Sequence, residues 1–396
     1  MTKNDDKRVP VLRFKGFNDD WAQRKLGDIA NVDSSKRIHR SEYTKEGIPF
    51  FRGSEITDRK ISNLIYISKK KYNEIKNQYG VPKPGDLLIT AVGTIGNIWK
   101  VDNTSFYYKD GNLIHINPKC IDEDYLVYYF QFLKYKKIID RVASGSNQKA
   151  LTIIKVQNLK IKYPQKEGQS LIGVLLKKTE NLIALQQRKL QQLKLLKKAM
   201  LQDLFTDKNV PKLRFNGFDA NWIQCKLEKE ALLTMGQSPS GSTYSDQPST
   251  YILVQGNADL KNGWVKPRIW TTQITKLAKK GDIIITVRAP AGKVGRTNFD
   301  VVLGRGVASI QGNDFIFYLL SKMDMNKYWK KYAAGSTFES INSNDIKNTR
   351  VHVPNLLEQN RIANLFLRLD DLIRFQQNKL NNLQKTKQFL FQNMFI

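Results

Sequence analysis

The fold of this 396-residue chain is decided by a segment that occurs twice. Residues 10–26 read PVLRFKGFNDDWAQRKL and residues 211–227 read PKLRFNGFDANWIQCKL, with ten of seventeen positions identical. A second repeat relates residues 145–206 to residues 335–396 at a constant offset of 190. A period of about 200 residues is too long for a solenoid and indicates duplication of a whole domain. The chain is therefore an internal pseudo-dimer, which suits a target that itself has two parts.

Each copy ends in a long segment with the periodicity of a coiled-coil helix, because apolar or semi-polar residues recur in steps of four and three. The first seam comprises Ile172, Leu176, Thr179, Ile183, Gln186, Leu190, Leu193, Lys197, Met200 and Leu204. The second seam comprises Ile362, Phe366, Leu369, Ile373, Gln376, Leu380, Leu383, Lys387, Leu390 and Met394. We expect six further residues to widen the apolar stripe: Leu175, Leu182, Leu185, Leu365, Leu372 and Phe375.

Two such helices in one chain most simply form an antiparallel pair. The alternative is that each packs separately on its own domain or on a partner protein. Gln186 and Gln376 occupy equivalent seam positions, as do Lys197 and Lys387. Polar seam residues can fix register at a cost in stability. The two lysines could equally extend to solvent near the helix ends.

The segments before the helices combine strand and helix patterns. Short β-rich runs bounded by Gly, Pro and Asp predict strands at 48–51, 87–90, 113–116, 251–254, 283–287 and 307–310. Aromatic and Leu residues at spacings of three and four predict helices over 121–142 and 314–333. We therefore expect an α+β protein with domains at 1–165 and 207–355, long helices at 166–206 and 356–396, and an internal pseudo-two-fold repeat.

The net charge of +29 indicates a polyanionic partner, nucleic acid above all. The long segments carry little of it, since 166–206 holds eight basic and three acidic residues and 356–396 holds six and three. Only two cysteines occur, and no apolar run reaches the length of a membrane span. With no signal-peptide pattern at the start of the chain, we expect a protein of the reducing cytoplasm.

Catalytic signatures are missing from the sequence. The Asn/Asp-Pro-Pro-aromatic motif of amino-methyltransferases requires a Pro-Pro dipeptide, and the sequence has none. It also lacks the phosphate-binding motif G-x-x-x-x-G-K-[ST] and the Pro-Asp dipeptide of a nuclease carboxylate cluster. The three histidines, His39, His115 and His352, have no metal-ligand spacing, and we expect His115 and His352 to be structural. The sequence thus predicts no catalytic residue, no metal site and no cofactor in this chain.

Four features together resemble the DNA-specificity subunit of type I restriction–modification enzymes. They are the repeated P-x-L-R-F-x-G-F…W…K-L opening, the Gly-Asp-hydrophobic strands with following glycine loops at 85–96 and 281–295, the Pro354…Glu358-Gln359 start of a long helix, and the domain–helix–domain–helix order. The first helix departs from this pattern, with Gly168 where the second copy has Glu358. That glutamate favours a helix N-terminus, so its absence affects how the first helix is capped.

The resemblance implies two target-recognition domains that each read half of a split sequence in double-stranded DNA, separated by an antiparallel coiled coil. It also implies two methylation subunits and two motor–nuclease (restriction) subunits as partners. S-adenosylmethionine, ATP and magnesium belong to those partners. The alternatives are a basic RNA- or DNA-binding scaffold, or a fused methyltransferase or nuclease, against which the missing motifs argue.

Base readout requires polar or basic side chains on loops between rigid elements. In the first copy the candidates are Arg52, Ser54, Thr94, Asn112, Ser146, Asn147, Gln148 and Lys149. In the second copy they are Gln255, Asn257, Arg288, Lys293, Arg305, Ser336 and Thr337. These loops differ most between the copies, whereas the flanking strands are alike. Such divergence fits two halves that read different bases, although Gly, Asn and Ser also populate ordinary turns.

Overall fold

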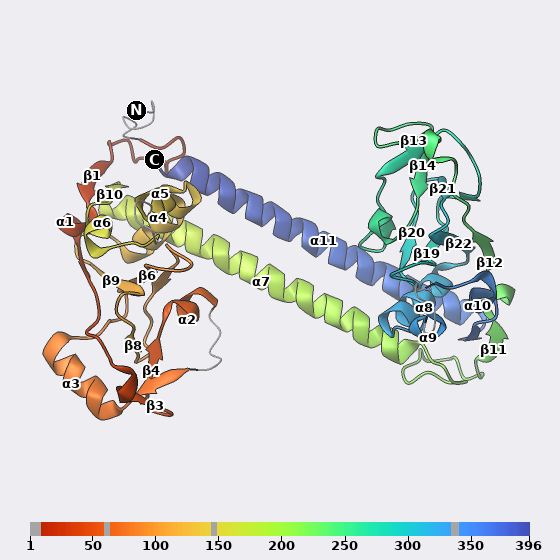
Figure 1. Ribbon diagram of the computed structural model, residues 1–396, viewed down its shortest axis with the longest axis horizontal. Helices are drawn as coiled ribbons and strands as arrows, with labels where there is room; N and C mark the ends of the chain where they lie inside the picture. Colours follow the sequence, from red (N-terminus) through yellow and green to blue (C-terminus); the bar gives the residue numbers. More distant parts are fainter. Residues whose placement is uncertain (1–8, 59–63, 144–148, 334–339) are drawn as a thin grey trace. The chain divides into compact units, whose positions relative to one another are not determined.

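The computed structural model describes residues 9–58, 64–143, 149–333 and 340–396. These residues form two compact units: unit 1 comprises the described residues up to 187 together with 379–396, and unit 2 comprises the described residues between 188 and 378. The two long helices, α7 (Lys166–Leu204) and α11 (Leu356–Met394), each contribute to both units (Figure 1). The chain is α+β, as the sequence predicts.

Unit 1 contains three small sheets, of strand order β2-β9-β6-β7, β3-β5-β4-β8 and β1-β10. Their strands are β1 (Ala22–Lys25), β2 (Ala30–Asp33), β3 (Tyr43–Thr44), β4 (Ile48–Phe51), β5 (Ile65–Ile67), β6 (Leu87–Thr90), β7 (Ile98–Lys100), β8 (Tyr107–Tyr108), β9 (Leu113–Pro118) and β10 (Lys160–Tyr163). Strand β6 is fully buried because both of its faces are covered. The predicted strands at 48–51, 87–90 and 113–116 are confirmed.

Unit 2 repeats this plan with additional strands, in the orders β12-β22-β19-β20-β16-β15, β13-β17-β14-β21-β18 and β11-β23. The strands are β11 (Ile223–Lys226), β12 (Leu232–Met235), β13 (Tyr244–Ser245), β14 (Tyr251–Val254), β15 (Leu260–Lys261), β16 (Trp264–Val265), β17 (Ile269–Thr271), β18 (Leu277–Ala278), β19 (Ile283–Thr286), β20 (Val294–Arg296), β21 (Val301–Leu303), β22 (Val307–Gln311) and β23 (Arg350–Val353). Three predicted strands are confirmed as β14, β19 and β22.

Shorter helices flank the sheets. Unit 1 has α1 (Leu26–Ile29), α2 (Gly53–Asp58), α3 (Lys69–Tyr79), α4 (Glu123–Tyr135), α5 (Ile138–Ala143) and α6 (Ile153–Gln157), with a 3-10 turn η1 (Arg40–Glu42). Unit 2 has α8 (Asp314–Met325), α9 (Lys330–Ala333) and α10 (Ser343–Lys347), with 3-10 turns η2 (Leu227–Lys229), η3 (Gly241–Thr243) and η4 (Asn257–Asp259).

The helices expected over 121–142 and 314–333 are each broken in two, which corrects the sequence prediction. The breaks fall at Lys137 and Lys327, each of which has a φ of +57°. A left-handed residue cannot continue a right-handed helix. The side-chain periodicity persists across the break because both pieces pack on the same core, so the sequence alone does not reveal it.

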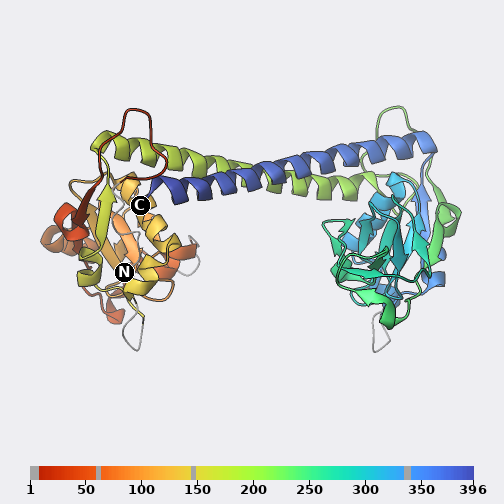
Figure 2. The same cartoon turned by 90° about the horizontal axis from the view of Figure 1, so that it is seen from above.

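Both long helices end inside the cores of the units. In unit 1 the last residues of α11 lie beside the first turns of α7, as Figures 1 and 2 both show. Phe395, just beyond α11, stacks on Phe132 with ring centroids 5.3 Å apart, and the Leu12 N–H donates to the Asn393 carbonyl at 2.8 Å. In unit 2, Leu201 and Leu204 of α7 share a core with Ile362 and Phe366 of α11. The first turns of one helix therefore pack against the last turns of the other in each unit, which is antiparallel pairing.

Within the described part of the chain, no helix combines the length and the apolar character that a membrane span requires.

Candidate nucleic-acid interface

In unit 1 four segments meet at the end of strand β6. The Lys109 N–H donates to the Phe51 carbonyl at 2.8 Å, which joins the loop after β4 to the loop between β8 and β9. The Ala91 N–H, directly after β6, donates to the Asn112 carbonyl at 2.8 Å, and the Leu151 N–H donates to the Ala91 carbonyl at 2.9 Å. These bonds gather the loops that carry Arg52, Asn112 and Lys149 at one edge of the unit.

Unit 2 builds the same arrangement at the end of β19. The Gly304 N–H donates to the Val254 carbonyl at 2.7 Å, the Val287 N–H to the Gly306 carbonyl at 2.9 Å, and the Ile341 N–H to the Val287 carbonyl at 2.9 Å. The approach is so close that a Cβ at residue 306 would lie 2.1 Å from the Gln255 carbonyl oxygen, so only glycine fits there. The loops that carry Gln255, Arg288 and Arg305 are thereby brought together.

A buried threonine hydroxyl pins a further loop in each unit. Thr90 Oγ1 donates to the Thr94 carbonyl at 2.5 Å and accepts from the Asn97 N–H at 2.9 Å. Thr286 Oγ1 donates to the Pro290 carbonyl at 2.7 Å and accepts from the Lys293 N–H at 2.9 Å. Both threonines are completely buried, so the loops that carry Thr94 and Lys293 are fixed from below. The sequence repeat contained these threonines, but gave no sign of what their hydroxyls bind.

The candidate base-reading side chains differ in how freely they can be presented. Exposed residues are Ser54, Thr94, Lys149, Asn257, Arg288 and Arg305. Half-buried residues are Arg52, Asn112, Gln255 and Lys293. Two of these are engaged by carboxylates: Arg52 Nη2 lies 2.6 Å from Glu55 Oε1, and Lys293 Nζ lies 2.8 Å from Asp324 Oδ1. The predicted candidates Ser146, Asn147, Gln148, Ser336 and Thr337 lie outside the described residues.

The heptad seams are visible in the burial of α7 and α11. Buried seam residues are Ile172, Leu176, Gln186, Leu190, Ile362, Phe366, Gln376, Leu380 and Leu390, and half-buried ones are Ile183, Leu193, Met200, Ile373 and Leu383. The expectation of a wider stripe is wrong in the middle of the helices, where Leu182, Leu185, Leu372 and Phe375 are exposed. A pair of helices covers only the two seam positions of each heptad, whereas neighbouring positions stay open.

Equivalent clamps connect the two helices to each unit's body. In unit 2, Asp370 accepts from Lys197 Nζ at 2.5 Å and from the Tyr318 hydroxyl at 2.9 Å. In unit 1, Glu180 accepts from Lys387 Nζ at 2.6 Å and from the Tyr128 hydroxyl at 3.0 Å. The two seam lysines therefore pair with a carboxylate on the opposite helix rather than simply extending into solvent.

The tyrosines of the clamps are held in their neutral form. Burial, and next the adjacent carboxylate, raises the pKa of Tyr128 and of Tyr318 well above the ordinary value. Each hydroxyl is consequently a hydrogen-bond donor at any physiological pH. The clamp thus links a helix of the unit body to a carboxylate of a long helix with a fixed direction of donation.

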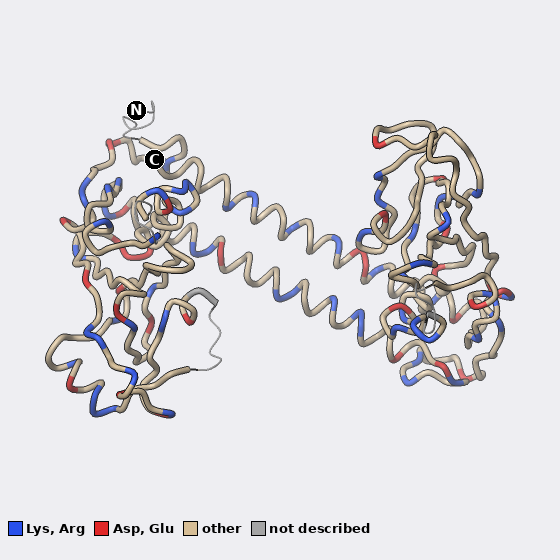
Figure 3. The backbone as a smooth tube through the Cα atoms, viewed as in Figure 1, with Lys and Arg blue, Asp and Glu red and all other residues tan. Residues whose placement is uncertain are grey.

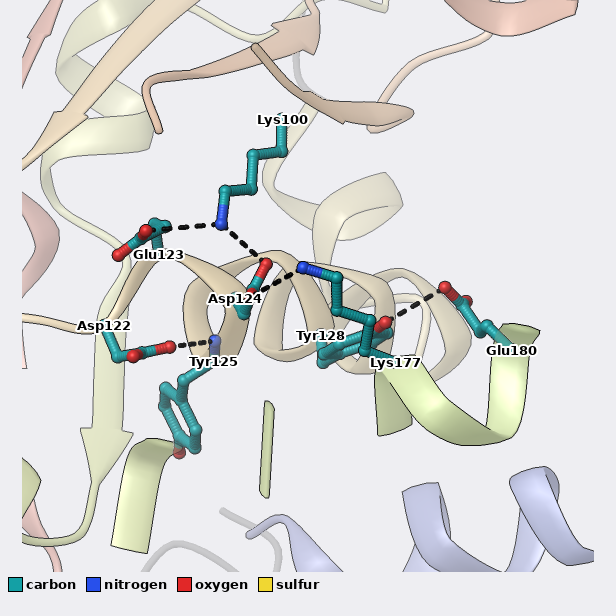
Figure 4. Close-up of polar contacts among 8 residues, drawn as sticks. All are labelled: Lys100, Asp122, Glu123, Asp124, Tyr125, Tyr128, Lys177 and Glu180. Carbon is teal, nitrogen blue, oxygen red and sulfur yellow. Dashed lines mark hydrogen bonds and ion pairs between the residues drawn. The ribbon is translucent and has the colours of Figure 1, made fainter. Parts of the chain in front are cut away.

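Figure 4 shows how the clamp of unit 1 continues into its sheet. Lys100 at the end of β7 lies 3.2 Å from Glu123 Oε1 and 2.8 Å from Asp124 Oδ1, and Lys177 of α7 lies 3.2 Å from Asp124 Oδ2. Burial opposes the charge of Lys100, but the two carboxylates outweigh it and raise the pKa of Lys100. Strand β7, helix α4 and helix α7 are thus fastened together, and the candidate loops rest on a rigid base.

The repeated opening motif has a structural role that the sequence did not disclose. In unit 2, Arg214 donates to both oxygens of Glu358 at 2.8 Å, and Trp222 Nε1 lies 3.3 Å from Glu358 Oε1. Glu358 is completely buried, so it does more than stabilise the start of a helix. In unit 1 Gly168 replaces it, and a Cβ there would lie 3.1 Å from Pro164 Cβ, which leaves no ready space for a side chain.

His115 is structural, as predicted. Its Nδ1 lies 2.9 Å from Asp33 Oδ1 and its Nε2 lies 2.8 Å from Asp86 Oδ2. Burial alone would lower the pKa of His115, but the bonds to the two carboxylates outweigh burial and raise that pKa to about 9. Among the described residues, no group of three or more His, Cys, Asp or Glu is arranged to hold a metal ion.

Comparison with known proteins agrees with this architecture. The profile of the family described as type I restriction modification DNA specificity domain matches residues 18–195 and 234–385. A Methanocaldococcus jannaschii chain described as the MjaX type I restriction enzyme specificity subunit is 29% identical over 391 residues, covering 93% of this chain and 91% of that protein. The type I S subunit from M. genitalium superposes with a TM-score of 0.64 at 13% identity, covering 98% of this chain and 99% of the other.

The HsdS subunit from Thermoanaerobacter tengcongensis has a TM-score of 0.50 at 21% identity, with 95% of this chain and 96% of the other covered. At these low sequence identities the solved structures support the fold alone. The family assignment rests on the matched profile, which covers most of both repeats. The chain therefore belongs to the type I restriction–modification DNA specificity family, as a specificity subunit, the non-catalytic member of such a system.

Proposed function

We propose that each unit reads one half of a bipartite, asymmetric site in double-stranded DNA through the loops at the ends of β6 and β19. The observation that carries this proposal is that the same four-segment arrangement occurs in both units with different side chains. Arg52 follows β4 where Gln255 follows β14, and Asn112 lies where unit 2 has Gly306. Two scaffolds of one kind with different polar loops suit two different half-sites.

In this proposal the domains at 1–165 and 207–355 recognise DNA, and the helices at 166–206 and 356–396 hold them at a set spacing. Lys and Arg lie along both long helices and over the loops of each unit (Figure 3). Because the long helices hold little of the net charge, the two domains should supply most of the phosphate contacts, and affinity should fall steeply with salt. Arg52→Ala should relax one half-site, whereas Lys70→Ala on the exposed face of α3 should weaken binding to all sequences alike.

The partners in this proposal are two methylation subunits and two restriction–translocation subunits, which bind S-adenosylmethionine, ATP and magnesium. The exposed apolar residues in the middle of the long helices support docking of such partners there. Leu182 and Leu185 in unit 1, and Leu372 and Phe375 in unit 2, are between 48% and 61% exposed, and exposed apolar side chains can mark protein interfaces. We place the complex in the cytoplasm, and we expect calorimetry to detect no tight binding of S-adenosylmethionine or ATP to the isolated chain.

The proposal is tested by exchanging residues 28–163 for the equivalent region of a relative with a different specificity. The reconstituted complex with methylation subunits is then used to map methylated adenines in DNA. Exactly one half of the recognised sequence should change. A change in both halves, or in neither, would contradict the assignment of one half-site to each unit, and binding without sequence preference would favour a basic scaffold.

A further inference from the structure

Each unit contains a buried carboxylate side chain that binds the loop after an inner strand of one sheet, β4 in unit 1 and β14 in unit 2. In unit 1, Glu55 Oε2 accepts the Arg52 N–H at 2.7 Å, and Glu55 Oε1 accepts the Ser54 hydroxyl at 3.0 Å. In unit 2, Asp259 Oδ2 accepts the Gln255 N–H at 2.8 Å and the Gly256 N–H at 3.2 Å. Both carboxylate side chains are 7% exposed.

The two carboxylates serve equivalent loops although they do not align in the sequence. Glu55 stands three residues after Arg52, whereas Asp259 stands four residues after Gln255. The longer loop of unit 2 has the shorter acidic side chain, and the carboxylate reaches the same backbone N–H in both. A carboxylate binds the equivalent backbone N–H in both units, although it comes from a different residue type at a different distance along the chain. This indicates that the loop conformation requires a carboxylate at that place.

The units differ in what balances the buried charge. In unit 1 the Arg52 guanidinium itself binds Glu55, through Nη2 at 2.6 Å and Nε at 3.3 Å. Burial alone would raise the pKa of Glu55, but the bonds from Arg52 outweigh it and lower that pKa. In unit 2 the counter-charge comes from Arg268, which lies 3.7 Å from Asp259 just before β17. Asp259 thus fixes only the backbone of Gln255, whereas Glu55 fixes both the backbone and the side chain of Arg52.

Each loop also supports its neighbour. The Phe51 carbonyl before Arg52 accepts the Lys109 N–H, and the Val254 carbonyl before Gln255 accepts the Gly304 N–H at 2.7 Å. A shift of the loop after β4 or β14 would therefore move the loops that carry Asn112 or Arg305 as well.

We propose that Glu55 and Asp259 are positioning residues for DNA readout, each setting the recognition loop of its own unit without touching a base. This inference rests on the proposed assignment of one half-site to each unit. Glu55 orients the Arg52 guanidinium and so limits the bases with which that group can form two hydrogen bonds. Asp259 fixes the backbone from which the Gln255 side chain is presented, and so limits the positions that this side chain can reach. Loss of the carboxylate should therefore relax specificity before it reduces overall affinity.

The test uses the full chain reconstituted with methylation subunits and a set of duplexes with single-base changes in either half-site. The variants Glu55→Gln and Asp259→Asn keep the size of the side chain and remove its charge. We expect Glu55→Gln to reduce discrimination by about tenfold at positions in the half-site of unit 1, the scale of one lost base contact, and to leave the other half-site unchanged. Asp259→Asn should do the reverse.

Matched controls come from carboxylates with the same local bonding at the opposite ends of the strands. Glu42 accepts the His39 N–H at 2.8 Å and pairs with Lys71, and it precedes β3 at the end of its sheet away from Arg52. Asp282 accepts the Lys279 N–H at 2.9 Å just before β19. Glu42→Gln and Asp282→Asn should leave discrimination at both half-sites intact, even if they lower the unfolding temperature.

Folded Glu55→Gln and Asp259→Asn proteins that discriminate like the wild type would overturn the proposal, as would equal relaxation of both half-sites by either variant. If Glu55→Gln does not fold, the variant Glu55→Asp serves instead, because it keeps the charge but moves it away from Arg52 by the length of one methylene. Unchanged base discrimination in folded Glu55→Asp would also overturn the proposal. Failure of the underlying assignment is separable, because the wild-type complex would then methylate no bipartite sequence at all.

Discussion

Replacement of Glu358 by glutamine is expected to destabilise unit 2 by about 3 kcal/mol, the lower end of the cost of breaking a buried ion pair by removing one partner. Glu358 is completely buried and receives two bonds of 2.8 Å from Arg214 and one of 3.3 Å from Trp222. The lower end applies because the Arg214 side chain is 14% exposed and can recover some hydration. For a unit of this size, each kcal/mol lowers the melting temperature by roughly 2–4 °C, so the expected shift is roughly 6–12 °C.

The measurement is thermal unfolding of the full chain, with hydrogen exchange read separately on peptides of unit 1 and unit 2. Faster exchange should be confined to unit 2, whose core contains Trp222. Arg13 provides the control, since it occupies the position of Arg214 in the first opening motif and, among the described residues, donates to the Asp19 carbonyl at 3.1 Å and to no carboxylate. Arg214→Ala should cost several kcal/mol, whereas Arg13→Ala should cost about 0.5 kcal/mol or less. A loss below about 1 kcal/mol for Glu358→Gln, or equal losses for the two arginines, would refute the reasoning.

Three further outcomes are expected. Because the pKa of His115 is raised to about 9, its imidazolium stabilises unit 1 fully below the unfolded pKa of about 6.5, and this contribution is lost as the pH rises through 9. Denaturant titrations across this range should show the loss in the wild type but not in His115→Ser, and the same dependence of unfolding free energy on pH in both proteins would contradict the prediction. A double-mutant cycle of Lys197→Ala and Asp370→Ala should give a coupling of about 1 kcal/mol, and additivity of the two losses would show that the pair contributes nothing. Insertion of four residues after Leu193 adds about 6 Å of helix and a stutter in the seam, so a folded variant should methylate sites with a changed spacer and intact half-sequences; retention of the original spacer would show that the helices do not set the distance.

The sequence by itself determined the duplication, the α+β class, the position of six of the strands and the two heptad seams. Each of these features depends on residues that are close together along the chain or on a repeated segment. Both can be recognised by comparing stretches of sequence without knowing which residues meet in space. Strand β6 has the bounds expected from Leu87–Thr90, because a short apolar run between turn residues has few other conformations. The seam positions from Ile172 onward are buried or half-buried, because the heptad spacing alone fixes which side of a helix they share.

Only the tertiary structure decided which side chains act together. Glu55 and Asp259 serve the same purpose at different offsets from Arg52 and Gln255, so comparison of the two repeats could not pair them. Glu358 meets Arg214 across 144 residues, and Lys197 meets Asp370 across 173. Such contacts follow from packing rather than from local preference. The exposure of Leu182 and Phe375 has the same origin, because an apolar residue beside a seam is covered only if a third element packs there.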